Sequence, residues 1–293
     1  MRRPHARRVR APHMKIIGTL GRAVKARPTK TNTDMKGSTK GQVALARALS
    51  KMGIMSRAEA ARRIRSGEIV VNGTVVTDPD HPVVPEHASI QVAGATVRHE
   101  PALTLLFHKP RGVVTTRSDP QGRPTVFDLL GTLPRYVAPV GRLDLASTGL
   151  LLLTNDTRLA DWLLDPAHAV PRVYIVTVRG ELADETLDRA RAGLRVDGDL
   201  LRAREIEVLK RSRRETHMRV TLVEGKNREL RRLFAACGCE VTRLKRVAFG
   251  GLELGTLTPG KWRVVRASEL RRAFPRAPLK DERHDEKHGP RRH

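Results

Sequence analysis

The stretch from Gly141 to Asp156, which reads GRLDLASTGLLLLTND, constrains the fold of this chain more than any other segment. Its four consecutive leucines, Leu150 to Leu153, predict a buried strand. Arg142 and Asp144 precede that strand in a glycine-bounded loop, so we expect this polar pair at the mouth of a buried structure. Two interpretations stay open: Asp144 caps the turn and Arg142 is a surface cation, or both side chains belong to a site.

The charge balance indicates the kind of partner. Lys and Arg number 56 against 31 Asp and Glu, a net charge of +25, which points to a polyanion, either nucleic acid or an anionic membrane surface. The longest leucine run is far short of the roughly 20 apolar residues of a spanning helix, so we expect no membrane. Two cysteines, Cys237 and Cys239, are too few for a disulfide framework or a four-ligand zinc site. We therefore expect reduced thiols and a cytoplasmic protein.

The length of 293 residues predicts a small domain and a larger one. We expect a disordered basic arm at 1–41, a small domain at 42–100, a larger domain at 101–273 and a charged tail at 274–293. The arm holds 12 Lys or Arg and one acid, without apolar periodicity. A transit peptide is the alternative for this arm, and Met14 or Met35 is an alternative start.

The small domain begins with two predicted helices. The first has apolar residues at helical spacing, namely Val43, Ala46 and Leu49. Gly53 ends it, and Ser56 with Glu59 forms a capping box for the second helix, which ends at Gly67. The apolar runs 69–71 and 75–76 flank Asn72-Gly73 and predict a hairpin on a type I′ turn. A last strand is expected at 90–92.

The two helices carry a basic face. Its cations are Arg47, Lys51, Arg57, Arg62, Arg63 and Arg65. A merely solvated face is the usual explanation of such a charge run. However, the order of helix, capped basic helix and Val-Asn-Gly hairpin resembles the S4 RNA-binding domain. The resemblance favours RNA as the partner, with Arg47, Arg57 and Arg62 at the phosphate backbone.

The larger domain contains many short apolar runs and few helices. Strands are expected at 103–107, 113–114, 136–140, 150–153, 173–178, 206–209, 218–223 and 262–265. Helices are expected at 158–164, 184–192 and 227–236, the last with Leu230, Leu233 and Phe234 packed and Arg228, Arg231 and Arg232 around the rim. The elements do not alternate regularly, which predicts an α+β fold with a mixed, largely antiparallel sheet.

Four motifs then occur in a fixed order. They are Lys109-Pro110-Arg111-Gly112, the stretch 141–156 with Asp144, Tyr174 in a predicted strand, and Gly225-Lys-Asn-Arg-Glu-Leu-Arg-Arg232. Together they resemble the pseudouridine synthases, in the branch where an S4 domain precedes the catalytic domain. The resemblance covers about residues 42 to 270 and implies a central mixed sheet crossed by an active-site cleft. It implies no metal and no organic cofactor.

The family reaction breaks the N1–C1′ bond of uridine, turns the uracil over and rejoins it through C5. The resemblance implies that Asp144 is the catalytic carboxylate, either a nucleophile at C1′ or the base that removes the 2′ proton. It places Arg231 beside Asp144 as a guanidinium that orients the acid and keeps it ionised. It also implies that Tyr174 stacks on the target base, against the ordinary choice of Tyr for a half-buried strand.

Substrate contacts follow from the same resemblance. A stacked uridine must be flipped out, and Arg142 is expected to hold the vacated space. Lys109, Lys226 and Arg228 are expected to contact phosphates. Arg172 departs from the family pattern, which often has Lys two residues before the Tyr, and this leaves its role open.

Two other classes share part of this pattern. A non-catalytic RNA-binding or ribosome-assembly factor needs the charge and the S4 unit but has no use for Asp144, Tyr174 and Arg231 together. A DNA-binding regulator shares only the charge, and no helix-turn-helix is visible. The sequence therefore predicts a monomeric enzyme acting on ribosomal RNA. Small-subunit rRNA, large-subunit rRNA and tRNA all remain candidate substrates, and large-subunit rRNA is favoured.

Overall fold

The computed structural model describes residues 41–133 and 135–279. Nearly all of the expected basic arm and most of the expected tail lie outside these residues. The described chain folds into a small helix-and-sheet unit followed by a larger unit built on one long sheet.

The small unit contains two helices and a four-stranded antiparallel sheet. Helices α1 (Leu45–Lys51) and α2 (Arg57–Arg65) bury Leu45, Leu49 and Ile64 completely. The sheet has the order β3-β2-β5-β6, with β2 at Ile69–Val71, β3 at Thr74–Val75, β5 at Ile90–Val92 and β6 at Ala95–Val97. A separate pair joins β1 (Val43–Ala44) to β4 (Pro82–Val83), so Val43 belongs to a strand and not to the first helix.

Local chemistry explains most of this unit. Asn72 and Gly73 have φ of 50° and 82°, the left-handed values that a type I′ turn needs, and they join β2 to β3 as expected. Ser56 caps α2 by accepting a hydrogen bond from the Glu59 amide at 3.1 Å. Only this half of the expected capping box forms, because the Glu59 carboxylate binds Arg62 and Arg63 instead.

The larger unit is organised on a nine-stranded sheet. Its order is β13-β14-β10-β15-β9-β7-β17, with β16 beside β15 and β8 beside β9. The strands are β7 (Thr104–Lys109), β8 (Ala138–Pro139), β9 (Thr148–Thr154), β10 (Arg172–Arg179), β13 (Glu205–Arg211), β14 (Glu215–Leu222), β15 (Val241–Phe249), β16 (Leu252–Glu253) and β17 (Trp262–Val264). Within the described residues β15 and β9 run parallel and every other pair in this sheet is antiparallel, which confirms the expected mixed, largely antiparallel α+β fold.

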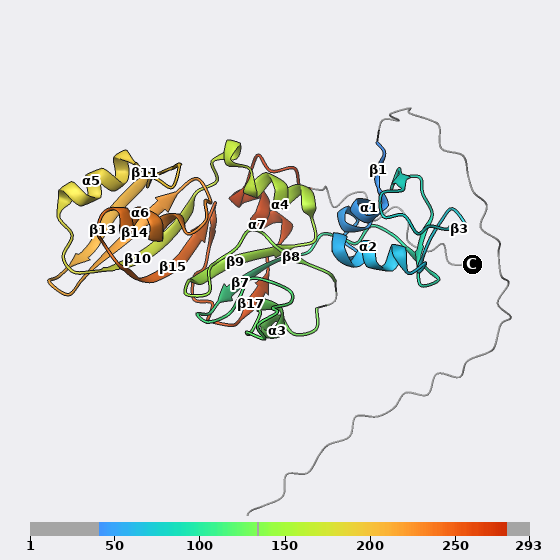
Figure 1. Ribbon diagram of the computed structural model, residues 1–293, viewed down its shortest axis with the longest axis horizontal. Helices are drawn as coiled ribbons and strands as arrows, with labels where there is room; N and C mark the ends of the chain where they lie inside the picture. The colour runs from blue at the N-terminus through green and yellow to red at the C-terminus, as the bar shows by residue number, and fades with distance from the viewer. Residues whose placement is uncertain (1–40, 134, 280–293) are drawn as a thin grey trace, which may run out of the picture. The chain divides into compact units, whose positions relative to one another are not determined.

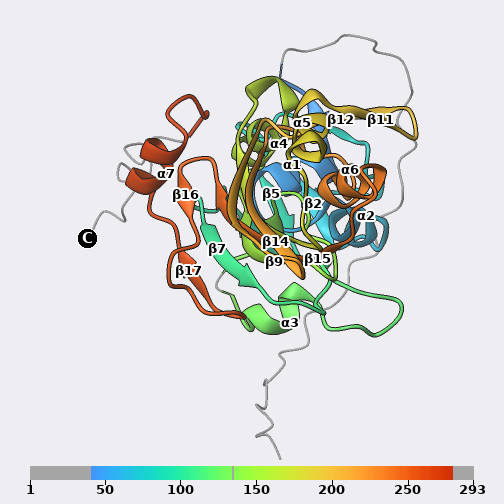
Figure 2. The ribbon, with the colours of Figure 1, turned by 90° about the vertical axis from the view of Figure 1, so that its left-hand side faces the viewer.

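Helices cover different parts of this sheet (Figure 1). Helices α5 (Asp184–Ala192) and α6 (Glu229–Ala236) lie over the β13-β14-β10-β15 half, with the hairpin of β11 (Leu194–Val196) and β12 (Asp199–Leu201) beside them. Helix α4 (Thr157–Leu164) and helix α7 (Ala267–Ala273) pack on β9 and β16, and Figure 2 shows α7 next to β16. The short helix α3 (Val126–Leu130) packs on the other face of β7 and β9, and a 3₁₀ turn spans Pro166–His168.

The four leucines of β9 explain why this strand is central. Leu150 and Leu152 join the core under α4 and α7, whereas Leu151 and Leu153 join the core under α3, and all four are 0% exposed. Alternate side chains of a strand point to opposite faces, so a strand covered on both sides has a continuous apolar run. The loop that holds Asp144 therefore enters the sheet at a strand that is covered on both faces.

Some expectations about the larger unit are wrong. The sequence pattern does not predict β15, because Arg243, Lys245 and Arg246 interrupt its apolar residues, and it does not predict α3 or α7. The expected tail boundary at 274 also fails. Phe274 is 2% exposed and meets the Phe249 ring edge-on at 6.3 Å between centroids, and Leu279 packs on the same core.

Candidate active site

The loop from Gly141 to Thr148 is fixed by main-chain and side-chain hydrogen bonds. The Gly112 amide donates to the Leu145 carbonyl at 2.8 Å, and Lys109 Nζ donates to the Ser147 carbonyl at 2.9 Å. The buried Thr115 hydroxyl donates to the Leu143 carbonyl at 2.9 Å and accepts from its amide at 3.3 Å. The amide and the carbonyl of Leu143, the residue before Asp144, are thus both hydrogen-bonded. These bonds fix the main chain from which the Asp144 carboxylate extends.

Glycine is required where this loop enters the sheet. Gly149 has φ of 109° and pairs with Arg246 of β15, and a Cβ on Gly149 would lie 2.1 Å from the Arg246 carbonyl oxygen. No other residue fits so close a backbone approach. This contact joins β9 to β15 and places Asp144 next to the residues of β10 and β15.

A pocket with a volume of about 110 Å³ opens at this junction. It brings together residues that the sequence separates by up to 86 positions: Arg142, Asp144, Tyr174, Lys226 and Arg228. Asp144 and Tyr174 are half-buried, and Arg142 is exposed at the rim. Five of the predicted site residues therefore line one pocket, including the candidate carboxylate and the candidate stacking tyrosine.

Arg231 lies near this group without the expected pairing. It donates from Nη1 to the Val241 carbonyl at 2.9 Å and from Nη2 to the Ala146 carbonyl at 3.5 Å, and its buried Nε has no partner in the described part of the chain. No hydrogen bond or ion pair joins the Arg231 guanidinium to the Asp144 carboxylate in this structure. Burial lowers the pKa of Arg231, Arg228 and Arg111 add to the lowering, and Asp144 opposes it. The two groups therefore interact electrostatically through space and not through direct hydrogen bonds between guanidinium and carboxylate.

Lys109 is not available to a phosphate, which corrects the expectation for this residue. It is 0% exposed, and its ammonium donates to the carbonyls of Pro110 and Ser147. Burial lowers its pKa to about 8, although the nearby Asp144 carboxylate raises it. Lys109 therefore holds the Asp144 loop from beneath.

The loop before α6 forms another wall of the pocket. Lys226 Nζ binds the Glu224 carboxylate at 2.6 Å and the Leu200 carbonyl at 2.8 Å, and the exposed Arg228 sits at φ 47° just before the helix. Glu229 is 5% exposed, and burial raises its pKa. Its carboxylate accepts a hydrogen bond from the Lys226 amide at 3.2 Å, which closes the turn.

Two buried arginines that the sequence interpretation did not assign line the same pocket. Arg172 and Arg246 are each 4% exposed, and both lie near the Phe249 ring, at 5.0 and 5.2 Å from its centroid. Arg172 donates to the carbonyls of Val170, Val223 and Leu163. The sequence signal for Arg246 is an arginine at an inward-facing position of an otherwise amphipathic strand. The sequence pattern does not predict that strand, so the signal cannot be used.

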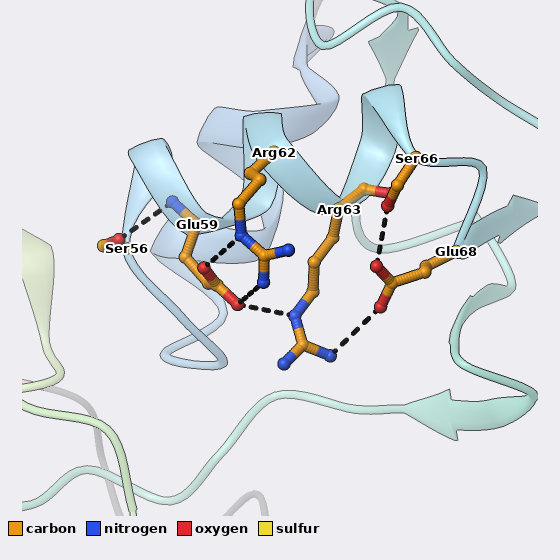
Figure 3. A network of polar contacts seen from close by, with 6 residues as sticks. All are labelled: Ser56, Glu59, Arg62, Arg63, Ser66 and Glu68. Carbon is orange, nitrogen blue, oxygen red and sulfur yellow. Dashed lines mark hydrogen bonds and ion pairs between the residues drawn. The ribbon is translucent and has the colours of Figure 1, made fainter.

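The cations of the small unit have a different setting (Figure 3). We define the α1–α2 face as Arg47, Arg57, Arg62, Arg63 and Arg65. The Glu59 carboxylate accepts from Arg62 Nη2 at 2.7 Å and from Arg63 Nε at 2.7 Å, and the hydrogen bonds of Arg62 and Arg63 lower its pKa to about 2. Arg47 and Arg57 are exposed and have no side-chain partner among the described residues. Of the residues expected to bind phosphate, Arg47 and Arg57 thus have no partner among the described residues, whereas Arg62 is paired with Glu59.

Two kinds of structure are absent from the described residues. These residues contain no group of three or more His, Cys, Asp or Glu side chains placed to hold a metal ion. None of their helices has the length and apolar character needed to cross a membrane.

The fold and the pocket together define a class of protein. A mixed α+β sheet carries a carboxylate, a tyrosine and several cations in one pocket, and a separate unit with an exposed basic face precedes it in the chain. This combination describes an enzyme that acts on nucleic acid. Family models match the RNA pseudouridylate synthases over residues 104–236 and the S4 domain over residues 45–88.

The relatives agree with this class. An uncharacterized RNA pseudouridine synthase of Aquifex aeolicus is 35% identical over 82% of this chain and 96% of its own. Ribosomal large subunit pseudouridine synthase B of Bacillus subtilis is 34% identical over 78% of this chain and 94% of its own. A solved pseudouridylate synthase, 24% identical, superimposes with a TM-score of 0.57 over 78% of this chain and 98% of its own, which supports the fold. The chain belongs to the family of RNA pseudouridine synthases, as its motifs predict.

Proposed function

We propose that this enzyme converts one uridine of large-subunit ribosomal RNA into pseudouridine, with Asp144 as the catalytic carboxylate. The similarity to the large-subunit synthase B of Bacillus subtilis, which covers nearly the whole of that relative, supports this RNA as substrate. The single observation that carries the site is the pocket that Asp144 and Tyr174 both line. The proposal includes a monomeric enzyme in the cytoplasm, where the ribosomes of its bacterial relatives are made.

Each lining residue has a proposed role. Asp144 acts at the sugar, either by attacking C1′ or by removing the 2′ proton, and Tyr174 stacks on the uracil. Arg142, exposed at the rim, occupies the space that the flipped nucleotide leaves. Lys226 and Arg228 contact the phosphates on either side of it. Arg231 stabilises the ionised Asp144 through space and holds the Ala146 carbonyl of its loop.

The small unit supplies binding and not chemistry. Arg47 and Arg57, which have no partner among the described residues, are proposed to contact RNA phosphates directly. Arg62 contacts a phosphate only after leaving Glu59. These contacts position the RNA and carry little sequence information, so recognition of the target uridine falls to the larger unit.

Unmodified transcripts test both the RNA and the residue. The purified protein is incubated with large-subunit rRNA, small-subunit rRNA and tRNA, and pseudouridines are mapped by carbodiimide labelling and primer extension. We expect one new pseudouridine in the large-subunit transcript. Product only in another RNA would contradict the substrate assignment.

Asp144→Asn tests the catalytic role with the same transcripts. The amide keeps the size of the side chain and removes the carboxylate, so we expect no pseudouridine and nearly unchanged RNA binding in a filter assay. Asp161→Asn, which removes a carboxylate from helix α4 away from the pocket, is the matched control and should turn over normally. Normal turnover by Asp144→Asn would contradict the role of this residue.

A further inference from the structure

The buried arginines of the pocket form no ion pairs within the described residues. Arg172 and Arg246 form no ion pair with any carboxylate of the described residues. Arg246 donates from Nε to the Leu150 carbonyl at 2.7 Å, whereas its Nη2 is buried without a partner in the part of the chain that the structure describes. An unpaired buried charge is costly, so two of them side by side indicate a partner that is absent from the free enzyme.

The charge of the pocket wall agrees with this. Five cationic residues line it, namely Arg142, Arg172, Lys226, Arg228 and Arg246, against the two acidic residues Asp144 and Glu229. Burial raises the pKa of Glu229, and its carboxylate acts on Arg172 through space without forming an ion pair with it. Arginine stays protonated in proteins, so Arg172 and Arg246 both present a positive charge to the pocket. The occupant that fits this wall is negatively charged.

The proposed reaction creates such a species at this place. When the N1–C1′ bond breaks, its electron pair stays on N1, and the uracil becomes an anion with charge spread over N1, O2 and O4. The electron deficiency at C1′ is met by a bond to the Asp144 carboxylate, or by loss of the 2′ proton to it. In both routes the uracil anion forms in the pocket. It is consumed when C5 bonds to C1′, as the C1′–Asp144 bond breaks or as Asp144 returns its proton to C2′. The C5 proton is then transferred to N1, and the Asp144 carboxylate is regenerated.

We propose that Arg246, together with Arg172, stabilises the uracil anion that forms when the N1–C1′ bond breaks. This inference rests on the proposed function. Fixed charges in a site of low dielectric lower the energy of a developing charge without reorganisation, and they do so more strongly than in water. The main-chain bonds of Arg172 and the Leu150 bond of Arg246 keep both guanidiniums in place before the substrate arrives.

A leaving-group experiment tests the proposal. RNA stem-loops carry at the mapped position either uridine or 5-fluorouridine, whose fluorine withdraws electrons and makes the ring a better leaving anion. Loss of the target nucleoside is followed in single turnovers with saturating enzyme, so that RNA affinity does not enter the rate. We expect Arg246→Gln to slow the uridine substrate by about 100- to 1,000-fold. The loss should be at least about tenfold smaller for 5-fluorouridine, which needs less stabilisation, and Arg246→Lys should be intermediate because it keeps the charge.

Arg243→Gln is the matched control. Arg243 lies on the same strand and is exposed on the opposite face of the sheet. Its substitution by Gln removes the same charge as Arg246→Gln. Its saturating single-turnover rate should equal that of the wild type. Equal losses for uridine and 5-fluorouridine in Arg246→Gln, or no loss, would overturn the proposal. Failure of the proposed function is a different result, because the wild type would then convert no uridine.

A second measurement does not depend on the folding of Arg246→Gln. The Asp144→Asn protein is bound to the 5-fluorouridine stem-loop, and fluorine NMR follows the loss of the N3 proton of the base against pH. The resulting anion carries charge on O2 and O4, as the leaving uracil anion does. A pocket that favours the anion should make the bound base ionise at lower pH than the same base in free RNA. Ionisation at the same or a higher pH would overturn the proposal.

Discussion

The cations of the α1–α2 face and those of the pocket have the same side-chain chemistry in opposite settings. On the α1–α2 face, Arg62 is 62% exposed and shares Glu59 with Arg63. In the pocket, Arg172 and Arg246 are 4% exposed and bind main-chain carbonyls. Exposed pairs are screened by salt and exchange partners readily, whereas a buried cation is screened much less and, when hydrogen-bonded, has a fixed position. The first setting suits attraction of RNA, and the second suits chemistry on one nucleotide.

The largest expected effect concerns the buried Lys109. Its pKa in the folded protein is about 8, against 10.5 in the unfolded chain, so protonation opposes folding at neutral pH. The folded state loses its proton first as pH rises, and the unfolded state then binds more protons. The free energy of unfolding should therefore rise by about 2–3 kcal/mol between pH 7.5 and 10 relative to Lys109→Met, which lacks this titration.

Urea denaturation of both proteins across that pH range measures this difference. Lys109→Met also loses the hydrogen bonds to Pro110 and Ser147, but that loss lowers its stability equally at each pH. If the free energy of unfolding changed with pH in the same way for both proteins, Lys109 would be hydrated in solution. Its environment would then not differ from that of the exposed cations on the α1–α2 face.

The next largest effect is expected for Arg231, and it can be measured as a change in the free energy of unfolding. Arg231→Ala leaves the Val241 carbonyl without its partner, and we expect a loss of about 1–3 kcal/mol in the free energy of unfolding. Because no direct bond joins Arg231 to Asp144, adding Asp144→Ala should change stability almost additively, with a coupling below about 1 kcal/mol. Denaturation of the two single variants, the double variant and the wild type gives this coupling. A coupling of about 3 kcal/mol or more would mean that the two side chains form a buried ion pair in solution.

A smaller effect is expected on the α1–α2 face. Arg47→Gln with Arg57→Gln should leave stability unchanged, since neither side chain has a partner among the described residues. RNA affinity should fall, and the slope of log affinity against log salt should decrease by about 1.4–1.8, according to the strandedness of the contacted RNA. The matched control is Arg179→Gln with Arg219→Gln, which removes two exposed arginines paired to Glu240 and Glu207 on the larger unit. An equal change in slope for both pairs would assign the effect to net charge alone.

The smallest effect sharpens the comparison within the α1–α2 face itself. Glu59→Gln removes the carboxylate that holds Arg62 and Arg63, so the Arg62 guanidinium becomes available to phosphate, whereas Arg63 keeps its ion pair with Glu68 at 3.5 Å. We expect RNA to bind about twofold to fivefold more tightly at low salt, a gain that vanishes as salt screens the exposed charges. Weaker binding would show that Glu59 positions these arginines for RNA and does not compete with it.

Local signals were sufficient for much of the fold and of the site. The Ser56 cap, the Asn72-Gly73 turn and the helical spacing in α6 each depend on residues within one turn of the chain, and all appear in the structure. The predicted Asp144 and Tyr174 do line one pocket. The prediction that Lys109 contacts a phosphate is wrong, because a lysine is rarely buried completely and the sequence alone therefore predicts an exposed side chain.

The sequence by itself determined the class of the protein, the order of its motifs and the buried strand that follows Asp144, because these depend on neighbouring residues and on a resemblance that neighbouring residues carry. Only the tertiary structure decided that β15 lies between β10 and β9, and that Arg246 therefore faces the pocket while Arg243 and Lys245 face solvent. It also decided that Phe274 returns to the core. Strand pairing and burial arise between residues far apart in the chain, and the preference of a side chain for a strand depends on what covers each face.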